Sequence, residues 1–129
     1  MLAYEKLISE GGSRDSHSES MQIDIADYSG EGNAINCGAH FGETKKREDD
    51  LKRVELPFDP RADFHVYALE WDETALVWYV DGKEVHRSEH APHAPFFMRL
   101  SLFEDQQSEA GLGGGAKEMT VDYVWMYSR

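Results

Sequence analysis

The stretch DFHVYALEWDETALVWYVDGKEVHR, residues 63–87, decides the fold class that we predict for this chain. Its runs at residues 64–71 and 76–80 are rich in aromatic and β-branched side chains and have the length of strands. The pair Asp81-Gly82 then separates the second run from residues 83–87. Such a pair is typical of a type I′ turn, because Gly adopts a positive φ without steric cost. The stretch therefore predicts antiparallel strands, the last two joined by a tight hairpin.

Further strand-like runs lie on either side of this stretch. They are residues 21–27, 34–41, 96–103 and 119–127. Several runs carry apolar residues on both faces, as strands do when they are buried between two sheets. Only residues 2–8 leave a helix open as an alternative. We therefore predict an all-β fold of two packed antiparallel sheets, with solvated connectors at residues 9–20, 43–53 and 104–118.

Length and composition exclude several classes of protein. The 129 residues leave room for one domain, and we find no repeat or boundary that divides residues 1–129. The 13 Lys and Arg against 25 Asp and Glu give a net charge of −12. This disfavours nucleic acid, an anionic membrane and strongly sulfated polysaccharides, because they attract clustered positive charge. No apolar run is long enough to span a membrane, and no signal peptide is visible at the start.

Four blocks of the sequence together resemble glycoside hydrolase family 16. They are MQIDIADY at 21–28, the stretch at 63–87, PFFMRLSLF at 95–103 and MTVDYVWMY at 119–127. In this order, the blocks resemble the family's catalytic strand, part of its second half, the strand on the cleft floor and the closing strand. Their spacing also agrees with the family, whereas residues 1–20 match poorly. The resemblance implies a jelly-roll sandwich of the concanavalin A-like lectin/glucanase type. It also implies activity on β-glucans or related galactans, and a secreted or cell-surface location.

The chain resembles only the C-terminal half of the family pattern. All-β sandwiches often run to about 200–250 residues, so the family's first half would precede residue 1. A sandwich without those strands would expose strand edges and apolar faces. We expect the missing strands to come from another chain or a second copy, with a homo-oligomer favoured over a compact minimal version.

The polar residues of the run at 21–27 form a candidate catalytic strand. Gln22 and Asp24 share one face, because side chains at i and i+2 do so in a strand. Asp27 joins them only if an extra residue near Ala26 forms a bulge. The resemblance implies a bulged pattern of Glu, any, Asp, any, any, Glu, which serve as nucleophile, helper and general acid/base. A retaining glycosidase holds its two carboxyl groups about 5–5.5 Å apart, and one strand can supply this spacing.

This chain departs from that pattern at both decisive positions. Gln22 stands in place of the nucleophilic Glu, and an amide is neutral and far less nucleophilic. Asp27 stands in place of the acid/base Glu and is one methylene shorter. Asp24 matches the helper, and His40 matches a His that the family often places beside the acid/base. Natural loss of catalysis, deliberate inactivation at Gln22 and altered chemistry all explain Gln22, but the two changes together favour natural divergence.

Aromatic residues and the single cysteine are further candidates for functional roles. Tyr28 and Phe103 are predicted to bind substrate together with His40, because both lie at the ends of strands expected to line the cleft. Tryptophans in dense apolar strands usually belong to the core, an interpretation that applies to Trp71, Trp78 and Trp125. The single cysteine, Cys37, is interpreted as a buried, inert thiol.

We predict no metal ligand and no cofactor. The spacing of His86, His90 and His93 resembles a zinc motif, but nearby prolines favour an irregular loop. Asp122 resembles a position that supplies a structural calcium ligand in some relatives, although calcium needs 6–8 oxygen ligands.

Three functions remain open from the sequence. The first is a family 16-like hydrolase, active or descended from active enzymes, acting on a β-linked polysaccharide through an impaired catalytic strand. The second is a lectin-like module that binds glycan through Tyr28, His40 and Phe103. The third is a structural sandwich that supports an oligomer. A polysaccharide or oligosaccharide is the partner in the first two.

Overall fold

The computed structural model describes residues 6–9, 21–41, 48–93, 95–102 and 118–127, which form strands and connections but no helix. The strands are β1 (Lys6–Ser9), β2 (Met21–Asp27), β3 (Ala34–Phe41), β4 (Glu48–Glu55), β5 (Tyr67–Trp71), β6 (Leu76–Val80), β7 (Lys83–Ser88) and β8 (Phe97–Arg99). The prediction of an all-β fold is confirmed. In the described part of the chain, no helix is long and apolar enough to cross a membrane.

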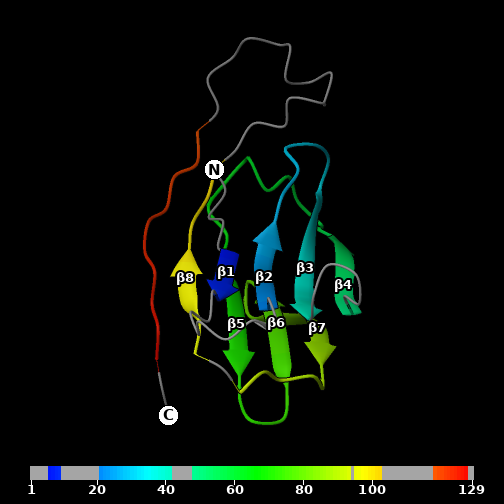
Figure 1. Cartoon of the computed structure of the whole chain (residues 1–129). Coiled ribbons are helices and arrows are strands. Elements are labelled where there is room, and N and C mark those ends of the chain that lie inside the picture. The colour runs from blue at the N-terminus through cyan, green and yellow to red at the C-terminus, as the bar shows by residue number, and fades with distance from the viewer. Residues whose placement is uncertain (1–5, 10–20, 42–47, 94, 103–117, 128–129) are drawn as a thin grey trace.

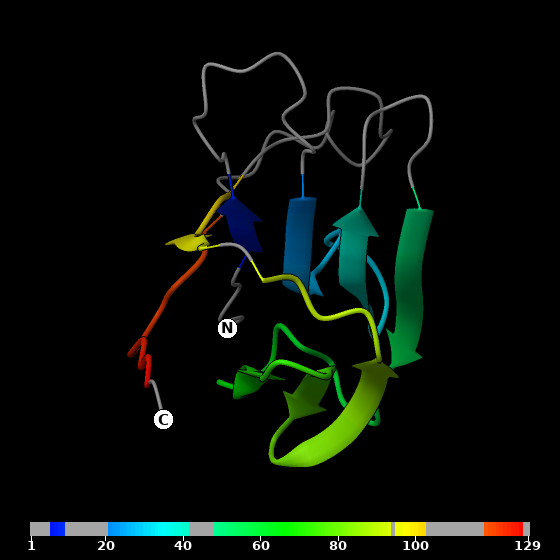
Figure 2. The same ribbon diagram turned by 60° about the horizontal axis from the view of Figure 1, so that its bottom comes forward.

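The strands form two antiparallel sheets, as predicted. The larger sheet has the order β4-β3-β2-β1-β8 and the smaller one the order β5-β6-β7. Figure 1 shows the strand order, and the turned view in Figure 2 shows the sheets as separate layers. The smaller sheet lies against one face of the larger one, and we call the opposite face, which no described strand covers, the open face.

The core fills the space between the two sheets. Partners in a β-ladder point to the same face, so Ile23 and its partner Ala39 are buried on the side of the smaller sheet. Trp78 of β6 meets them there and is fully buried. The other buried members of this cluster are Ile25, Ala26, Ile35, Cys37, Val54, Leu56, Tyr67, Leu76 and Val80. Burial of this apolar surface is the main force that holds the two layers together.

The predicted hairpin turn between β6 and β7 is present. Asp81 has φ 50° and Gly82 has φ 78°, so both central residues have the positive φ of a type I′ turn. The Asp81 carboxylate also accepts a hydrogen bond from the backbone NH of Val66 at 2.9 Å and lies 2.8 Å from His65 Nδ1. The turn therefore also holds the segment that leads into β5.

The interpretation of residues 43–53 as a connector is wrong over 48–53, because β4 begins at Glu48 and pairs with β3 along its whole length, whereas residues 43–47 lie outside the described part. The charged composition of these residues predicted a solvated connector, but an edge strand also tolerates charge, which protects its free edge from pairing with other chains. Lys52 Nζ donates to the Val85 carbonyl oxygen of β7 at 2.8 Å, so one of these charges also links the sheets. Residues 6–9, where a helix was left open, are a strand as well.

The prediction of a closing strand at residues 119–127 is also wrong. These residues belong to no strand, and Trp125 and Tyr127 are 69% and 81% exposed. A strong β-propensity does not by itself make a strand, because a strand also needs backbone pairing, and this segment pairs with none of the described strands. The run predicted at 96–103 is a strand only over β8, and Phe103 lies outside the described residues.

Gly38 on β3 is needed where β3 and β4 approach closely. Its φ is 142°, and a Cβ there would collide with the carbonyl oxygen of Asp50 and lie 2.8 Å from Leu51 Cα. Gly32, in the β2–β3 turn, also has a positive φ of 68°, but a Cβ there would meet nothing within 4 Å. A side chain at position 32 would therefore meet only an unfavourable backbone conformation, whereas one at position 38 would also meet a collision.

We expect Gly38→Ala to lower the free energy of unfolding by about 3 kcal/mol or more, since overpacking adds to the cost of the positive φ. Gly32→Ala should cost only about 1–2 kcal/mol, the price of the left-handed conformation. Urea denaturation of both variants measures the difference. An equal loss of unfolding free energy in the two variants would show that β3 and β4 can move apart at position 38 to make room for a Cβ.

Candidate active site

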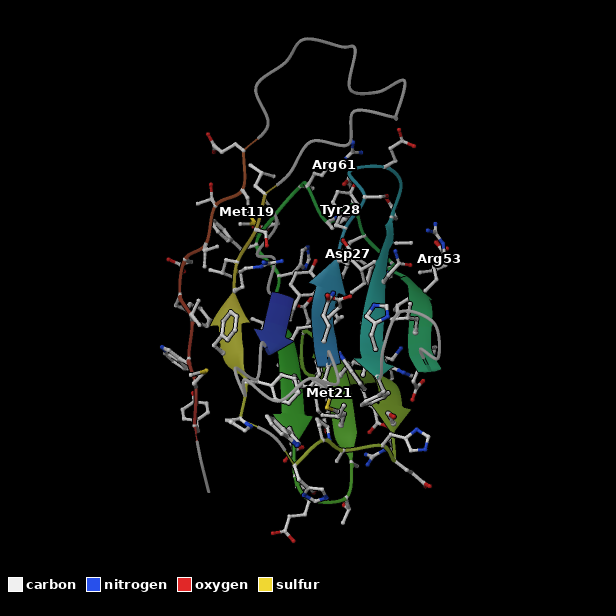
Figure 3. The ribbon with its side chains drawn as sticks, viewed as in Figure 1. Met21, Asp27, Tyr28, Arg53, Arg61 and Met119 are labelled. Carbon is white, nitrogen blue, oxygen red and sulfur yellow. The ribbon has the colours of Figure 1, made fainter. Side chains whose placement is uncertain are left out.

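The predicted bulge in β2 is present and brings three polar residues to one face. Asp24 pairs with Gly38 and Asp27 pairs with Asn36, so β2 advances three residues while β3 advances two. The extra residue lies within Ile25-Ala26, and both side chains are buried in the core. The bulge therefore returns Asp27 to the open face of the larger sheet. Figure 3 shows Asp27 at the end of β2 opposite Met21.

Asp24 is the centre of a hydrogen-bonded group on this open face. Gln22 Nε2 donates to Asp24 Oδ1 at 2.7 Å, and His40 Nε2 lies 3.3 Å from Asp24 Oδ2. His40 comes from β3, where it pairs directly with Gln22. Asp24 is only 5% exposed, so these contacts compensate for the water that its carboxylate loses. The structure thus brings Gln22, Asp24 and His40 together.

The amide at position 22 determines the electrostatics of this group. A neutral amide can donate a hydrogen bond to a carboxylate, which another carboxylate cannot do without a proton. A Glu at position 22 would place two acidic groups where Gln22 and Asp24 now lie 2.7 Å apart, and such a pair shares a proton at neutral pH. Gln22 therefore contributes a hydrogen-bond donor to Asp24 where a Glu would add a second acidic group.

Trp78 holds the bulge from the opposite sheet, a role that the sequence analysis did not foresee. Its indole Nε1 donates to the backbone carbonyl oxygen of Asp24 at 2.9 Å, in a buried hydrogen bond between sheets. The His86 ring packs on the indole with a centroid distance of 4.8 Å. His86 Nε2 in turn lies 3.1 Å from Asp50 Oδ1, with no well-aligned hydrogen bond. The core interpretation of Trp78 is confirmed.

The structure directs Tyr28, one of the two predicted aromatic ligands, to the β2–β3 turn. The Tyr28 hydroxyl donates to the Gly32 carbonyl oxygen at 3.0 Å, and its ring packs against the core. Burial raises the pKa of this hydroxyl. Figure 3 places Tyr28 beyond Asp27, on the side of Arg61. Tyr28 thus stabilises the β2–β3 turn, and Phe103 lies outside the described residues.

The other two tryptophans lie at the surface. Trp71 is 38% exposed, donates from Nε1 to the Pro92 carbonyl oxygen at 3.1 Å and packs edge-on against Phe96. Trp125 is 69% exposed, so its interpretation as a core residue is wrong. Among the described residues, the contacts of these two tryptophans do not include Asp24.

Two hollows lie at the end of the sandwich near Met21. One of about 400 Å³ is lined by Met21, Phe41, Glu73, Glu89, His90, Ala91, Pro92 and His93. A second of about 350 Å³ adjoins it and is lined by Trp71, Asp72, Glu73, Pro92, His93 and Pro95. Neither is lined by Gln22, Asp24 or Asp27, of which Asp24 is buried and the other two are half-buried.

The histidines of the zinc-like motif are separated in the structure. His86 lies in β7 against Trp78, whereas His90 and His93 follow the strand and line the first hollow. Asp122 is exposed in the segment 118–127. Among the described residues, no group of three or more His, Cys, Asp or Glu side chains could hold a metal ion.

Comparison with known proteins identifies the family. The model of Glycosyl hydrolases family 16 matches residues 7–125, nearly the whole chain. The chain belongs to glycosyl hydrolase family 16. A β-glucanase of Paenibacillus polymyxa is 31% identical over 78 residues, covering 58% of this chain and 33% of the relative. The endo-1,3-1,4-β-glycanase EglC of Rhizobium meliloti is 29% identical over 113 residues, covering 83% and 24%.

Solved structures show the same fold. The κ-carrageenase of Zobellia galactanivorans aligns with a TM-score of 0.56 and 24% identity, over 74% of this chain and 42% of that one. The κ-carrageenase of Pseudoalteromonas carrageenovora, solved with an oligotetrasaccharide of κ-carrageenan, gives 0.53 and 21%, over 74% and 41%. The chain spans a third or less of the length of the relatives named above and under half of these structures.

We expect Trp78→Phe to lower the free energy of unfolding by about 1–3 kcal/mol, because the buried Asp24 carbonyl loses its donor. It should also shift the NMR signals of the Gln22 side-chain amide, which reports on the geometry at Asp24. Leu76→Ala, a fully buried change in the same strand, is the control and should destabilise the protein without moving those signals. Unchanged Gln22 signals in Trp78→Phe would show that the indole does not position the group.

A second prediction concerns Cys37, which is 1% exposed. Burial raises the pKa of its thiol from 9.0 to about 12. The folded chain therefore keeps this proton between pH 9 and 12, where an unfolded thiol loses it, so stability from Cys37 falls as the pH rises through this range. At pH 8 we expect Ellman's reagent to react at least about 100-fold more slowly with the native chain than with the urea-unfolded chain. Equal rates would show that the site opens freely.

Proposed function

We propose that this chain is a family 16 protein derived from hydrolases of β-linked polysaccharides, with an impaired catalytic strand and an open face that binds glycan. The observation that carries the proposal is the 2.7 Å hydrogen bond from Gln22 Nε2 to Asp24 Oδ1. It places a neutral amide where the family pattern has its nucleophilic Glu. An amide cannot form the covalent glycosyl intermediate of a retaining enzyme.

The other polar groups of the open face retain part of a glycosidase's chemistry. Asp27 would protonate the leaving oxygen of a glycosidic bond, and Asp24 would stabilise positive charge that develops on the sugar. His40 and Gln22 hold the Asp24 carboxylate in place. Without a nucleophile, cleavage would depend on attack by water, which gives inversion and very slow turnover.

The charge of the chain supports a neutral glycan as the ligand. The net charge is −12, and Asp24 and Asp27 both lie on the open face. Sulfate groups would be repelled by this field, whereas hydroxyl groups of a β-glucan or an unsulfated galactan would find donors and acceptors. Relatives named β-glucanase are consistent with this choice. Because such polymers lie outside the cell, we also propose a secreted or cell-surface location.

A lectin-like module without catalysis is the second candidate, and the Gln22 amide favours it too. Gln22, Asp24 and His40 form a fixed polar group that offers hydrogen bonds to sugar hydroxyls. Tyr28 does not contribute, since its hydroxyl is bonded to the β2–β3 turn. In both candidates the partners are a polysaccharide or oligosaccharide and, as a separate proposal, a second copy of this chain.

The test of the first candidate is Gln22→Glu. We expect this change to raise the release of reducing sugar from laminarin or lichenan by about 100-fold or more over the unmodified chain, as a carboxylate at this position restores the missing group. The double variant Gln22→Glu/Asp27→Glu should be more active still, because the acid then reaches the glycosidic oxygen. Agarose tests the galactan alternative in the same assay.

Gln22→Ala is the control and should gain no activity, since it removes the amide without adding a carboxylate. Affinity electrophoresis on the same glycans measures binding separately from hydrolysis. Binding without activity in any variant would favour the lectin-like module. Hydrolysis by the unmodified chain at the rate of Gln22→Glu would contradict an impaired strand, and neither binding nor hydrolysis would contradict both candidates.

A further inference from the structure

The edge strand β4 turns polar side chains toward the smaller sheet. Asp50 pairs with the buried Ala39, and Lys52 pairs with the buried Cys37. Because ladder partners point to the same face, Asp50 and Lys52 also lie on the side of the smaller sheet. Lys52 Nζ donates to the Val85 carbonyl oxygen of β7 there, at 2.8 Å. Polar groups of β4 therefore reach across to β7 at this edge of the sandwich.

His86 of β7 meets Asp50 at the same edge. The His86 side chain is only 12% exposed, and its Nε2 lies 3.1 Å from Asp50 Oδ1. Nε2 is buried and makes no well-aligned hydrogen bond with the described residues. A neutral imidazole carries a hydrogen on only one ring nitrogen, whereas an imidazolium carries one on each and attracts a carboxylate. Protonation of the His86 ring therefore strengthens its contact with Asp50.

The same ring contacts the residue that holds the bulge of β2. His86 pairs with Trp78 across the β6–β7 ladder, and the two rings are 4.8 Å apart between centroids, at an angle of 31°. The indole donates from Nε1 to the Asp24 carbonyl oxygen at 2.9 Å. Trp78 is fully buried, and a close-packed interior transmits a displacement rather than absorbing it. A change in the position of the His86 ring therefore reaches the Asp24 backbone through the indole.

Few titratable groups of the described residues face His86 from the strands packed against β7, which are β3, β4 and β6. β4 turns Asp50 and Lys52 to this side, and the Lys52 ammonium is bound to a carbonyl oxygen of β7. β3 contributes the Cys37 thiol, and burial raises the pKa of this thiol to about 12, so it stays uncharged near neutral pH. β6 contributes Trp78 and apolar side chains. Asp50 is thus the carboxylate that a charged His86 ring meets.

We propose that His86 is a positioning residue for the polar group at Asp24, and that its protonation against Asp50 changes the geometry of that group through Trp78. An imidazolium is drawn toward the Asp50 carboxylate, and the indole that packs on it moves with it. The hydrogen bond to the Asp24 carbonyl changes as a result. Histidines commonly change charge between about pH 5 and 8, so the link responds in this range. The coupling requires no glycan and is therefore independent of the proposed function.

A pH titration by NMR tests the coupling. His40 contacts Asp24 directly, so the measurement uses His40→Gln, in which the amide can donate to Asp24 but gains no charge. The reporters are the Trp78 indole NH and the backbone NH of Ile25, which belongs to the same peptide group as the Asp24 carbonyl. We expect both signals to move together over about pH 5–8. Adding His86→Phe, which keeps an aromatic ring on the indole without a titratable nitrogen, should abolish the movement.

Asp50→Asn and Glu84→Gln form a matched pair, since each removes one carboxylate charge. Asp50→Asn should reduce the movement of both signals by about 2-fold or more, because a charge-assisted hydrogen bond is roughly twice as strong as a neutral one. Glu84 lies on β7 but binds Arg87, at 2.8 Å, so Glu84→Gln should leave the movement unchanged.

Three results would overturn the proposal. They are signals that do not move with pH in the His40→Gln chain, movement that persists in His86→Phe, and equal movement in Asp50→Asn and Glu84→Gln. Asp50 is partly exposed at the edge of the sandwich, so Asp50→Asn keeps the test decisive if the His86→Phe chain does not fold.

Discussion

The hydrogen bond from the Trp78 indole to the Asp24 carbonyl is the contact on which the open face depends. It joins the two sheets at the bulge of β2, where the ladder with β3 is interrupted. A bulge leaves backbone groups without their ladder partners, and in a buried place each such group costs about 1–3 kcal/mol. Trp78 donates to the Asp24 carbonyl oxygen from the opposite layer, so the core itself stabilises the irregular strand.

The bulge in turn decides where an acidic side chain lies. In a regular strand Asp27 would point with Ile23 and Ile25 into the space between the sheets, where an unpaired carboxylate is costly. The extra residue places Ile25 and Ala26 in the core and Asp27 on the open face. Apolar burial, the indole hydrogen bond and the exclusion of charge from the core all favour the same register. The arrangement of Gln22, Asp24 and Asp27 therefore follows from packing, whatever chemistry the face now performs.

Features set by neighbouring residues could be predicted from the sequence, and features set by distant ones could not. The Asp81-Gly82 turn and the shared face of Gln22 and Asp24 follow from backbone geometry over a few residues, and both are present. β4 was missed because its pairing with β3 overrides a charged composition. The prediction of a strand at 119–127 was wrong for the converse reason, because a high strand propensity does not supply the backbone pairing that a strand needs.

The candidate site divides in the same way. The resemblance placed His40 beside the acid/base position, whereas its ring nitrogen lies 3.3 Å from the Asp24 carboxylate across the β2–β3 ladder. The family position of Tyr28 suggested substrate contact, but its hydroxyl reaches a carbonyl only four residues away in the turn. A hydrogen bond to an acceptor close in sequence is favoured, because few residues lose conformational entropy when it forms. The role of Trp78 depends on a contact 54 residues apart, which no local pattern encodes.

Gln22 links the stability of this face to the impaired catalytic strand that we propose. A working pair of carboxylates stores repulsion that the rest of the fold must offset, so active sites are commonly less stable than an inert replacement. Here the Gln22 amide instead donates a 2.7 Å hydrogen bond to Asp24. Once catalysis is not required, such a change is favoured by folding alone. Under this proposal the shorter Asp27 has the same history, because nothing then selects the reach of the acid.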